Sequence, residues 1–273
     1  MEFIIKSKAL YSTWVFYKPN RVLFDCGEGI STILGNKIYG IENIFLTHSH
    51  IDHIAGLWGF VNTRNNAMGS REKDLNIYYP KGSRQIKEYL SFILKMNSRL
   101  RYTLNIQELE ITDEVKISEN RIMKPFKTRH SPGEISYGYR ILEKRKKLKN
   151  EYRNFSQEDI IRIKKEKKIF EEYYGNILTI SGDTQPISPE YAKNADILLH
   201  ECTFMIDADR KIRNHTTLTE LKKLIEEAKP KKLIVYHVSG RYNRMIKKVE
   251  KQLILDYPDI DVKVINTEKT YEF

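Results

Sequence analysis

The residues best suited to chemistry lie in one short segment, between a hydrophobic stretch and an apolar stretch. Residues 46–53 carry the pattern H-x-H-x-D-H, in which the potential ligands are His48, His50, Asp52 and His53. Imidazole and carboxylate groups bind zinc and other borderline divalent metals. A loop at the end of a strand lets such side chains converge, and four ligands this close together favour two metal ions over one. The segment therefore predicts a two-metal site.

Further candidate ligands are spread over the rest of the chain. His130, His215 and His237 lie at expected strand ends or in turns, and Asp183 follows Gly182 at the end of a predicted strand. A glycine there permits close approach of the backbone. A lone histidine in such a place is usually structural or faces solvent. Together with the H-x-H-x-D-H segment, these side chains are better explained as parts of one metal site.

Short strand and helix patterns alternate along the chain and must position these residues. The alternation indicates sheets covered by helices. The predicted strands are residues 3–6, 13–17, 21–25, 43–47, 76–79, 176–181, 196–200, 233–236 and 262–265, with three or four more between 104 and 142. The predicted helices are residues 54–62, 84–96, 218–228 and 245–255. No internal repeat or low-complexity linker divides the chain, which favours one domain over residues 1–273.

Composition excludes several classes of protein. The 273 residues are 40% apolar and 30% charged, which is typical of a globular chain rather than a disordered one. No apolar run reaches the roughly 18 residues that a membrane span needs, so we expect a cytoplasmic location. The two cysteines, Cys26 and Cys202, lack zinc-ribbon or redox spacing and are expected to be reduced. A formal net charge of +11 favours a polyanionic partner such as nucleic acid or an anionic surface.

Most of the positive charge lies in one interval, residues 144–168. It contains eleven Lys or Arg and four acidic residues. Ser156, three residues before Asp159, predicts a helix start, and Ile160, Ile163 and Phe170 form a thin apolar stripe. The interval is expected to hold a helix of about 15 residues, or about 22 Å. A solvated surface helix is the simplest interpretation of such a charge run.

Several motifs, spread nearly from end to end, resemble those of one enzyme family. They are Phe24-Asp25-Cys26-Gly27-Glu28-Gly29, the H-x-H-x-D-H segment, His130 ahead of Ser136-Tyr137-Gly138-Tyr139-Arg140, Gly182-Asp183-Thr184, His200-Glu201-Cys202-Thr203, His215-Thr216-Thr217, and His237 before Ser239-Gly240-Arg241-Tyr242. The H-x-H-x-D-H pattern alone indicates the metallo-β-lactamase superfamily, and the other motifs together resemble the tRNase Z (ribonuclease Z) family. The resemblance implies an α/β (α+β) fold, the metallo-β-lactamase αββα sandwich, with a protruding basic arm.

The resemblance also implies a role for each site residue. One zinc would be held by His48, His50 and His130, and a second by Asp52, His53 and His237, with Asp183 bridging the two. Metals about 3.5 to 4 Å apart clamp the attacking and leaving oxygens of a phosphodiester. Asp52 would also accept the proton of the attacking water, and His215, steered by Glu201, would protonate the leaving oxygen.

Asp25 and His200 are expected one layer behind the ligands. Metal-bound imidazoles usually donate their other N–H to a carboxylate or carbonyl, and Asp25 beside the Gly-Glu-Gly turn is a candidate acceptor. A simple turn or helix-cap aspartate is the alternative for this residue.

The lysine-rich interval occupies the position of the family's tRNA-gripping arm. By resemblance, residues 143–175 form an inserted basic arm that contacts phosphates of the RNA body. The expected RNA-binding residues are Lys144, Arg145, Lys146, Lys147, Lys149, Lys164, Lys165, Lys167 and Lys168. The family's usual homodimer is expected by resemblance alone.

The leading hypothesis is a zinc-dependent endoribonuclease with two Zn²⁺ per subunit that removes the 3′ trailer of precursor tRNA and leaves a 3′-hydroxyl. Mn²⁺ or Fe²⁺ would suit the same nitrogen and oxygen ligands. A general phosphodiesterase on small or cyclic nucleotides is the alternative enzyme. A metal-bearing RNA-binding protein without catalysis is a third hypothesis. No membrane is among the expected partners.

Overall fold

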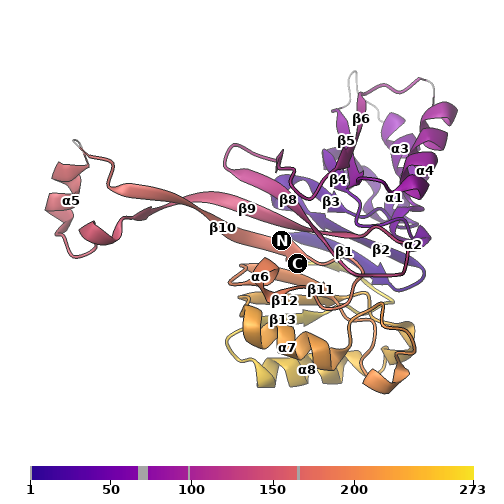
Figure 1. Cartoon of the computed structure of the whole chain (residues 1–273). Helices are drawn as coiled ribbons and strands as arrows, with labels where there is room; N and C mark the ends of the chain where they lie inside the picture. Colours follow the sequence, from indigo (N-terminus) through magenta and orange to yellow (C-terminus); the bar gives the residue numbers. More distant parts are fainter. Residues whose placement is uncertain (1, 67–72, 98, 165–166) are drawn as a thin grey trace.

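The computed structural model describes residues 2–66, 73–97, 99–164 and 167–273, and it contains two seven-stranded sheets packed face to face (Figure 1). The first sheet has the order β14-β1-β2-β3-β4-β5-β6, and the second has the order β13-β12-β11-β10-β9-β8-β7. The first sheet's strands are β1 (Phe3–Lys8), β2 (Ser12–Tyr17), β3 (Val22–Phe24), β4 (Asn43–Phe45), β5 (Leu75–Pro80), β6 (Leu104–Leu109) and β14 (Thr270–Glu272). Those of the second are β7 (Val115–Lys116), β8 (Arg121–Lys127), β9 (Tyr137–Leu148), β10 (Phe170–Ile180), β11 (Ile197–Glu201), β12 (Lys232–Tyr236) and β13 (Asp261–Val264).

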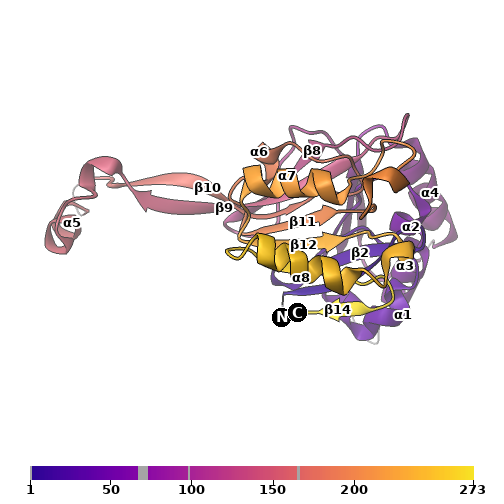
Figure 2. The same cartoon turned by 90° about the horizontal axis from the view of Figure 1, so that it is seen from below.

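Helices cover the outer face of each sheet, as Figures 1 and 2 show from two sides. Over the first sheet lie α1 (Ile30–Leu34), α2 (Ile51–Ile54), α3 (Leu57–Asn65) and α4 (Arg84–Met96). Over the second lie α6 (Pro189–Ala192), α7 (Leu218–Ala228) and α8 (Ile246–Asp256). Among the described residues, no helix is both long and apolar enough to span a membrane.

Three apolar clusters occupy the spaces between these layers. One contains Leu57, Phe60 and Ile93 under the helices of the first sheet, and a second contains Phe24, Phe45 and Tyr139 between the sheets. The third joins the second sheet to α7 and α8. The strands of the inner layers therefore bury both faces, which explains why β11 is a continuous apolar run before His200. The predicted αββα sandwich is confirmed.

Parallel pairing decides where the strand ends meet. Strands β3, β4, β5 and β6 pair in parallel, as do β10, β11, β12 and β13. Parallel neighbours end at the same edge of a sheet, and ligands bind outside those carboxyl ends in open α/β sheets. The H-x-H-x-D-H segment follows β4, Asp183 follows β10, and His237 follows β12. This arrangement brings residues far apart in sequence to one edge of the sandwich.

The basic interval departs from the predicted helix. Strands β9 and β10 extend beyond the sheet as a two-stranded ribbon (Figure 1), and the described residues of its tip contain one short 3-10 helix, Asn150–Tyr152, and one α-helix, α5, Gln157–Ile163. The predicted start is correct, because the Asp159 N–H donates to the Ser156 side chain at 3.1 Å. The prediction that Phe170 belongs to the apolar stripe of the helix is wrong, because Phe170 begins β10. Lysine and arginine are good helix formers, but cross-strand pairing decides the structure here.

Candidate metal centre

Seven predicted ligands meet at one edge of the sandwich. His48, His50, Asp52 and His53 lie in the turn from β4 into α2, while His130 comes from the connection between β8 and β9. Asp183 and His237 follow β10 and β12, and both His237 and the glycine before Asp183 have positive φ. Of the seven, all but His50 are buried.

The two predicted ligand sets are both present as groups of close atoms. His48, His50 and His130 form one group, and Asp52, His53 and His237 form another, with the ligand atoms of each group within 4.8 Å of one another. Asp52 Oδ2 lies 3.4 Å from His237 Nε2 and 3.6 Å from His53 Nε2.

Asp183 lies between the two sets. Its Oδ2 is 3.1 Å from His237 Nε2, 3.3 Å from His53 Nε2 and 3.9 Å from His48 Nε2. A carboxylate in contact with histidines of both groups is placed as a bridging ligand would be.

Unpaired buried atoms show that a metal suits this site. His48 Nε2, His53 Nε2 and Asp183 Oδ1 are buried without a hydrogen-bond partner. Such atoms are costly unless a partner satisfies them, and a divalent cation would satisfy all three. Burial, together with the nearby charge of His53, holds the pKa of His48 well below its usual value. The resulting neutral imidazole is the form that binds metal.

Asp25 stands behind the second ligand set. It accepts a hydrogen bond from His53 Nδ1 at 2.7 Å and two from Thr47, through the backbone N–H at 2.7 Å and Oγ1 at 2.9 Å. The hydrogen bond from His53 Nδ1 to Asp25 fixes the tautomer of His53 and leaves His53 Nε2 free to face the site. His200 is different: its Nδ1 donates to the Glu201 carbonyl at 2.7 Å, and its Nε2 lies 3.4 Å from the Ile187 N–H. Neither of these bonds joins His200 to a predicted ligand.

Glu201 and His215 form a buried ion pair beside the ligands. His215 Nδ1 lies 3.0 Å from Glu201 Oε1. The fully buried carboxylate also accepts from the backbone N–H groups of Thr184, Thr203 and Thr216 at 2.8 to 3.1 Å. Burial favours the neutral acid, but the His215 charge and hydrogen bond outweigh burial and lower the pKa of Glu201.

The same pair raises the pKa of His215 to about 9, against the opposing effect of burial. A protonated His215 at neutral pH can donate a proton. His215 also lies within 4.8 Å of ligand atoms of His130 and Asp183, so proximity alone leaves a ligand role open.

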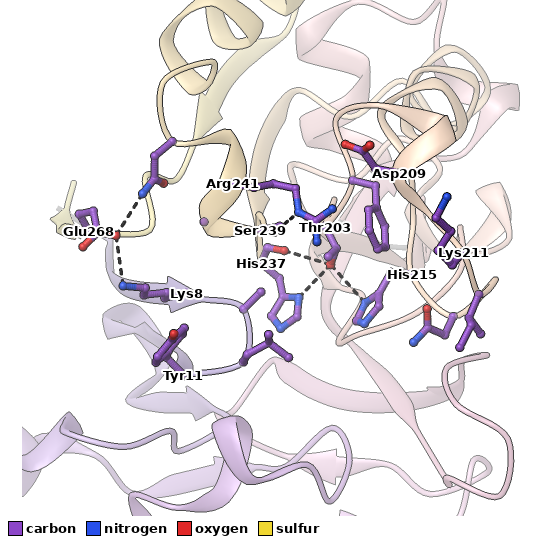
Figure 3. A pocket seen from close by; sticks show the side chains of 17 residues that line it. Lys8, Tyr11, Thr203, Asp209, Lys211, His215, His237, Ser239, Arg241 and Glu268 are labelled. Atoms are coloured by element: carbon purple, nitrogen blue, oxygen red, sulfur yellow. Dashed lines mark hydrogen bonds and ion pairs between the residues drawn. The ribbon is translucent and has the colours of Figure 1, made fainter.

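Thr203 contacts several candidate site residues, although the sequence analysis did not single it out. Its Oγ1 lies 3.2 Å from His215 Nδ1 and 3.0 Å from His237 Nδ1, as Figure 3 shows. The same oxygen lies 2.9 Å from Glu201 Oε2. The Thr203 hydroxyl therefore links the Glu201–His215 pair to His237, which is a predicted ligand. Its place two residues after Glu201 in the His-Glu-Cys-Thr motif was the available signal. His130 Nδ1 instead contacts the Asn214 carbonyl at 3.0 Å, and a backbone partner leaves no mark in the sequence.

A pocket of about 780 Å³ opens beside His215 and His237 (Figure 3). Its walls include Tyr11, Lys211 and Arg241, so aromatic and basic side chains line the pocket that leads to His215. The turn carrying Leu10 is held against the site, because the Leu10 N–H donates to Asp52 Oδ2 at 3.0 Å. The pocket has the size of a small-ligand site.

Most of the predicted RNA-binding residues lie on the arm, but several are paired. Lys144 and Lys146 contact Glu172, Lys147 contacts Glu171 at 3.1 Å, and Arg145 contacts Asp196 at 2.7 Å. Lys164 lies 5.9 Å from the ring centre of Phe170. Lys149, Lys167 and Lys168 lie near the tip, and Lys165 lies outside the described residues.

Comparisons with known proteins agree with this geometry. The family model described as "Anti-Pycsar protein Apyc1" matches residues 7–256. Ribonuclease Z from Listeria monocytogenes is 34% identical over 280 residues, covering 92% of this chain and 86% of that protein. Among solved structures, the metallo-β-lactamase fold protein YhfI from Bacillus subtilis has a TM-score of 0.68 at 15% identity, with 99% of both chains covered. Human tRNase Z, short form, has a TM-score of 0.66 at 20% identity, with 98% of both chains covered.

The two structural likenesses show the metallo-β-lactamase fold, and the sequence likeness shows the family. The expectation from the motifs is thereby confirmed. The chain belongs to the ribonuclease Z family, and its sequence also places it in the family described as Anti-Pycsar protein Apyc1.

Proposed function

We propose that this protein is a zinc-dependent endoribonuclease that removes the 3′ trailer of precursor tRNA and leaves a 3′-hydroxyl on the tRNA. The observation that carries the proposal is the convergence of both ligand sets, Asp183 and the Glu201–His215 pair on one centre. Membership of the ribonuclease Z family supports the choice of substrate. We also propose a cytoplasmic location for the reaction.

In this proposal the cations are two Zn²⁺ per subunit. His48, His50 and His130 would hold one, Asp52, His53 and His237 the other, and Asp183 would contact both. When bound, they supply Lewis-acid charge next to the scissile phosphate. Manganese or iron would suit the same ligands, so elemental analysis of the purified protein decides the metal.

The protein's own residues then move the protons. Water attacks the phosphorus, the bond to the leaving 3′-oxygen breaks, and Asp52 accepts the proton that the water loses. His215 donates a proton to the 3′-oxygen through its Nε2, because its Nδ1 is engaged by Glu201. The buried Glu201 carboxylate keeps His215 protonated and oriented between successive turnovers.

The test is the length of the products made from one precursor tRNA, with and without an encoded CCA. We expect one cut at the 3′ end of the tRNA body and a 3′-hydroxyl on the product. Asp52→Ala should abolish cleavage at saturating RNA while RNA binding persists. RNA binding without turnover in the wild-type protein would instead support the non-catalytic hypothesis.

A phosphodiesterase acting on small or cyclic nucleotides is the second candidate. The pocket of about 780 Å³ beside His215 favours it, because it could enclose a nucleotide. Deleting the arm separates the two: selective loss of tRNA cleavage supports the first, and undiminished tRNA cleavage contradicts the arm's role.

We also propose a homodimer, on family resemblance and on an exposed apolar surface. Trp58 and Phe92 stack with ring centres 5.7 Å apart, and their side chains are 38% and 51% exposed. Ile33 and Ile51 are exposed on neighbouring helices of the same half. Light scattering on the purified protein measures the assembly directly, and a monomer at working concentration contradicts it.

A further inference from the structure

A second pocket, of about 500 Å³, lies at the root of the arm and is distinct from the catalytic pocket. It is bounded by β9, β10 and the turn after α6, which lies beside the root of the arm in Figures 1 and 2. Asp196 lines this pocket and lies immediately before β11, whereas Glu201 ends that strand. The two residues are five positions apart, or about 16 Å at the rise of a strand.

Arg140 is the unusual residue of this pocket. Its Nε is buried without a hydrogen-bond partner, and its guanidinium lies 5.2 Å from the ring centre of Tyr191. Among the residues that the structure describes, no carboxylate lies within ion-pair distance of Arg140. A partly buried guanidinium normally has an anionic partner, and its fork of donors matches a phosphate. Arg140 also ends the Ser-Tyr-Gly-Tyr-Arg motif, for which the proposed catalytic chemistry gives no role.

The other charges of the pocket add to this preference. Lys193 is exposed and makes no ion pair within the described part of the chain. The remaining two cations are engaged, since Lys231 contacts Asp196 at 2.7 Å and Arg145 contacts the same carboxylate at 2.7 Å. Two acidic residues and four basic residues line the pocket, so the net charge of its lining is positive.

The position of Arg145 depends on a glycine. A Cβ at Gly175 would lie 2.8 Å from Cδ, Nε and Nη1 of Arg145. The absence of a side chain at Gly175 therefore lets Arg145 lie across β10 and reach Asp196. The charge of Arg145 is thus paired within the protein. Arg140 and Lys193 are left as the cations available to a ligand.

Two tyrosines of β10 also contribute to the lining of the pocket. Tyr173 and Tyr174 line it and are 39% and 52% exposed. Exposed tyrosines beside basic side chains are the usual surface for an unpaired base next to a backbone phosphate.

We propose that this pocket binds a backbone phosphate of the RNA whose 3′ end occupies the catalytic centre, through Arg140 and Lys193. The inference rests on the proposed function, and it adds a binding site at the arm's root, separate from the arm's tip. One RNA molecule can reach both sites, because they lie at opposite ends of the same strand.

The experiment measures precursor-tRNA binding and cleavage by Arg140→Gln and Lys193→Gln over a range of salt concentrations. We expect KM for the RNA to rise about tenfold for Arg140→Gln, the value of a hydrogen bond to a charged group, with kcat at saturating RNA changed less than twofold. The slope of log K against log salt should fall by about 0.7 to 0.9 for each phosphate that a variant no longer binds. Arg140→Lys keeps the charge and should recover part of the affinity.

Lys95→Gln is the matched control for Lys193→Gln, because Lys95 is also an exposed lysine without an ion pair in the described part of the chain, and it lies on α4. It should leave KM and the salt slope unchanged. Since Lys193 is on the surface, loss of affinity in its variant is not a folding defect.

Two results overturn the inference. One is unchanged KM and salt slope in both variants while the wild type cleaves precursor tRNA. The other is binding of adenosine monophosphate that both variants abolish without any effect on RNA, which would assign the pocket to a free nucleotide. Absence of tRNA cleavage by the wild type is a separate outcome, because it contradicts the proposed function itself.

Discussion

At the scale of single residues, His215 has two possible roles that its position alone does not separate. Its Nδ1 is fixed by Glu201, yet its ring also lies close to His130 and Asp183. A proton donor needs a raised pKa and a fixed orientation, and Glu201 supplies both. Against the effect of burial, Asp183 and Asp25 also raise the pKa of His53, which is a predicted ligand. The raised pKa of His215 therefore suits a proton donor, and metal content separates the two roles.

His215→Ala should accordingly slow RNA cleavage by about 10²- to 10⁴-fold, the usual contribution of a general acid. Metal content should stay at the wild-type level, because the two predicted ligand sets remain complete. Single-turnover rates and elemental analysis on the same preparation check both points. His130→Ala is the matched comparison, since it removes a predicted ligand and should lower metal content. Equal metal loss in the two variants would make His215 a ligand.

Thr203 offers a second test at this scale, because its hydroxyl contacts Glu201, His215 and His237. Thr203→Val keeps the shape and removes the hydroxyl, so the buried carboxylate and two imidazoles lose a common partner. We expect kcat to fall about tenfold or more with KM for the RNA nearly unchanged, since an unsatisfied buried polar group costs about 1 to 3 kcal/mol.

Thr203→Ser retains the oxygen and should restore most of the rate. If Thr203→Ser is as slow as Thr203→Val, an oxygen at this position is not sufficient for the rate, which contradicts a positioning role of the hydroxyl alone. Thermal denaturation of both variants detects any general loss of stability.

At the scale of elements, the arm is less basic than its sequence suggests. Its shaft pairs lysines of β9 with Glu171 and Glu172 of β10, two acids just beyond the interval that looked most basic. Exposed pairs of this kind contribute little stability, but they place a negative charge beside each lysine. Residues 149–168, which lie between the two strands in the sequence, include seven basic and four acidic residues. The tip is therefore the better site for binding phosphates.

Replacing Lys164, Lys167 and Lys168 by glutamine should weaken precursor-tRNA binding and lower the salt slope by about 2, since each bound phosphate contributes about 0.7 to 0.9. The matched control is the triple replacement of Lys144, Lys146 and Lys147 by glutamine. It removes the same charge from the shaft and should have less than half the effect. Filter binding at several salt concentrations measures both. Equal slopes for the two triple variants would contradict the assignment to the tip.

The arm also shows where sequence reasoning failed among the elements. The strands and helices of the two layers follow local patterns, and α4 and α7 have the predicted bounds, residues 84–96 and 218–228. The ribbon does not follow such a pattern, because β9 is stabilised by partners more than twenty residues away in sequence. A run of Lys and Arg favours a helix by local propensity. Here its pairing with β10, as between Lys146 and Glu172, makes it a strand.

At the scale of the whole molecule, the fold determines the site through the edge that its parallel strands share. Spacing in the sequence singled out the histidines, and the family resemblance sorted them into two sets. The structure brings both sets together. Thr203 and the Asn214 carbonyl were missed because their roles depend on atoms of other loops. The candidate ligands could be found in the sequence, whereas the hydrogen-bonded support behind them required three-dimensional placement.

That edge also joins the two halves of the sandwich, so metal should stabilise the whole fold. His48 and His53 belong to the first half, whereas Asp183 and His237 belong to the second, and their facing atoms are buried. Without a cation, His48 Nε2, His53 Nε2 and Asp183 Oδ1 lack hydrogen-bond partners, and the two sheets lose a link. A ligand at about 100 times its Kd stabilises a protein by about 2.7 kcal/mol.

Removing the metal with a chelator should therefore lower Tm by about 5 °C or more, given a shift of roughly 2 to 4 °C per kcal/mol for domains of 150 to 250 residues. Calorimetry with and without chelator, followed by zinc add-back, measures the change. Asp183→Ala serves as the comparison, because it removes the carboxylate between the two sets and should make Tm much less sensitive to the chelator. An unchanged Tm after verified metal removal would show that the two halves hold together without the cations.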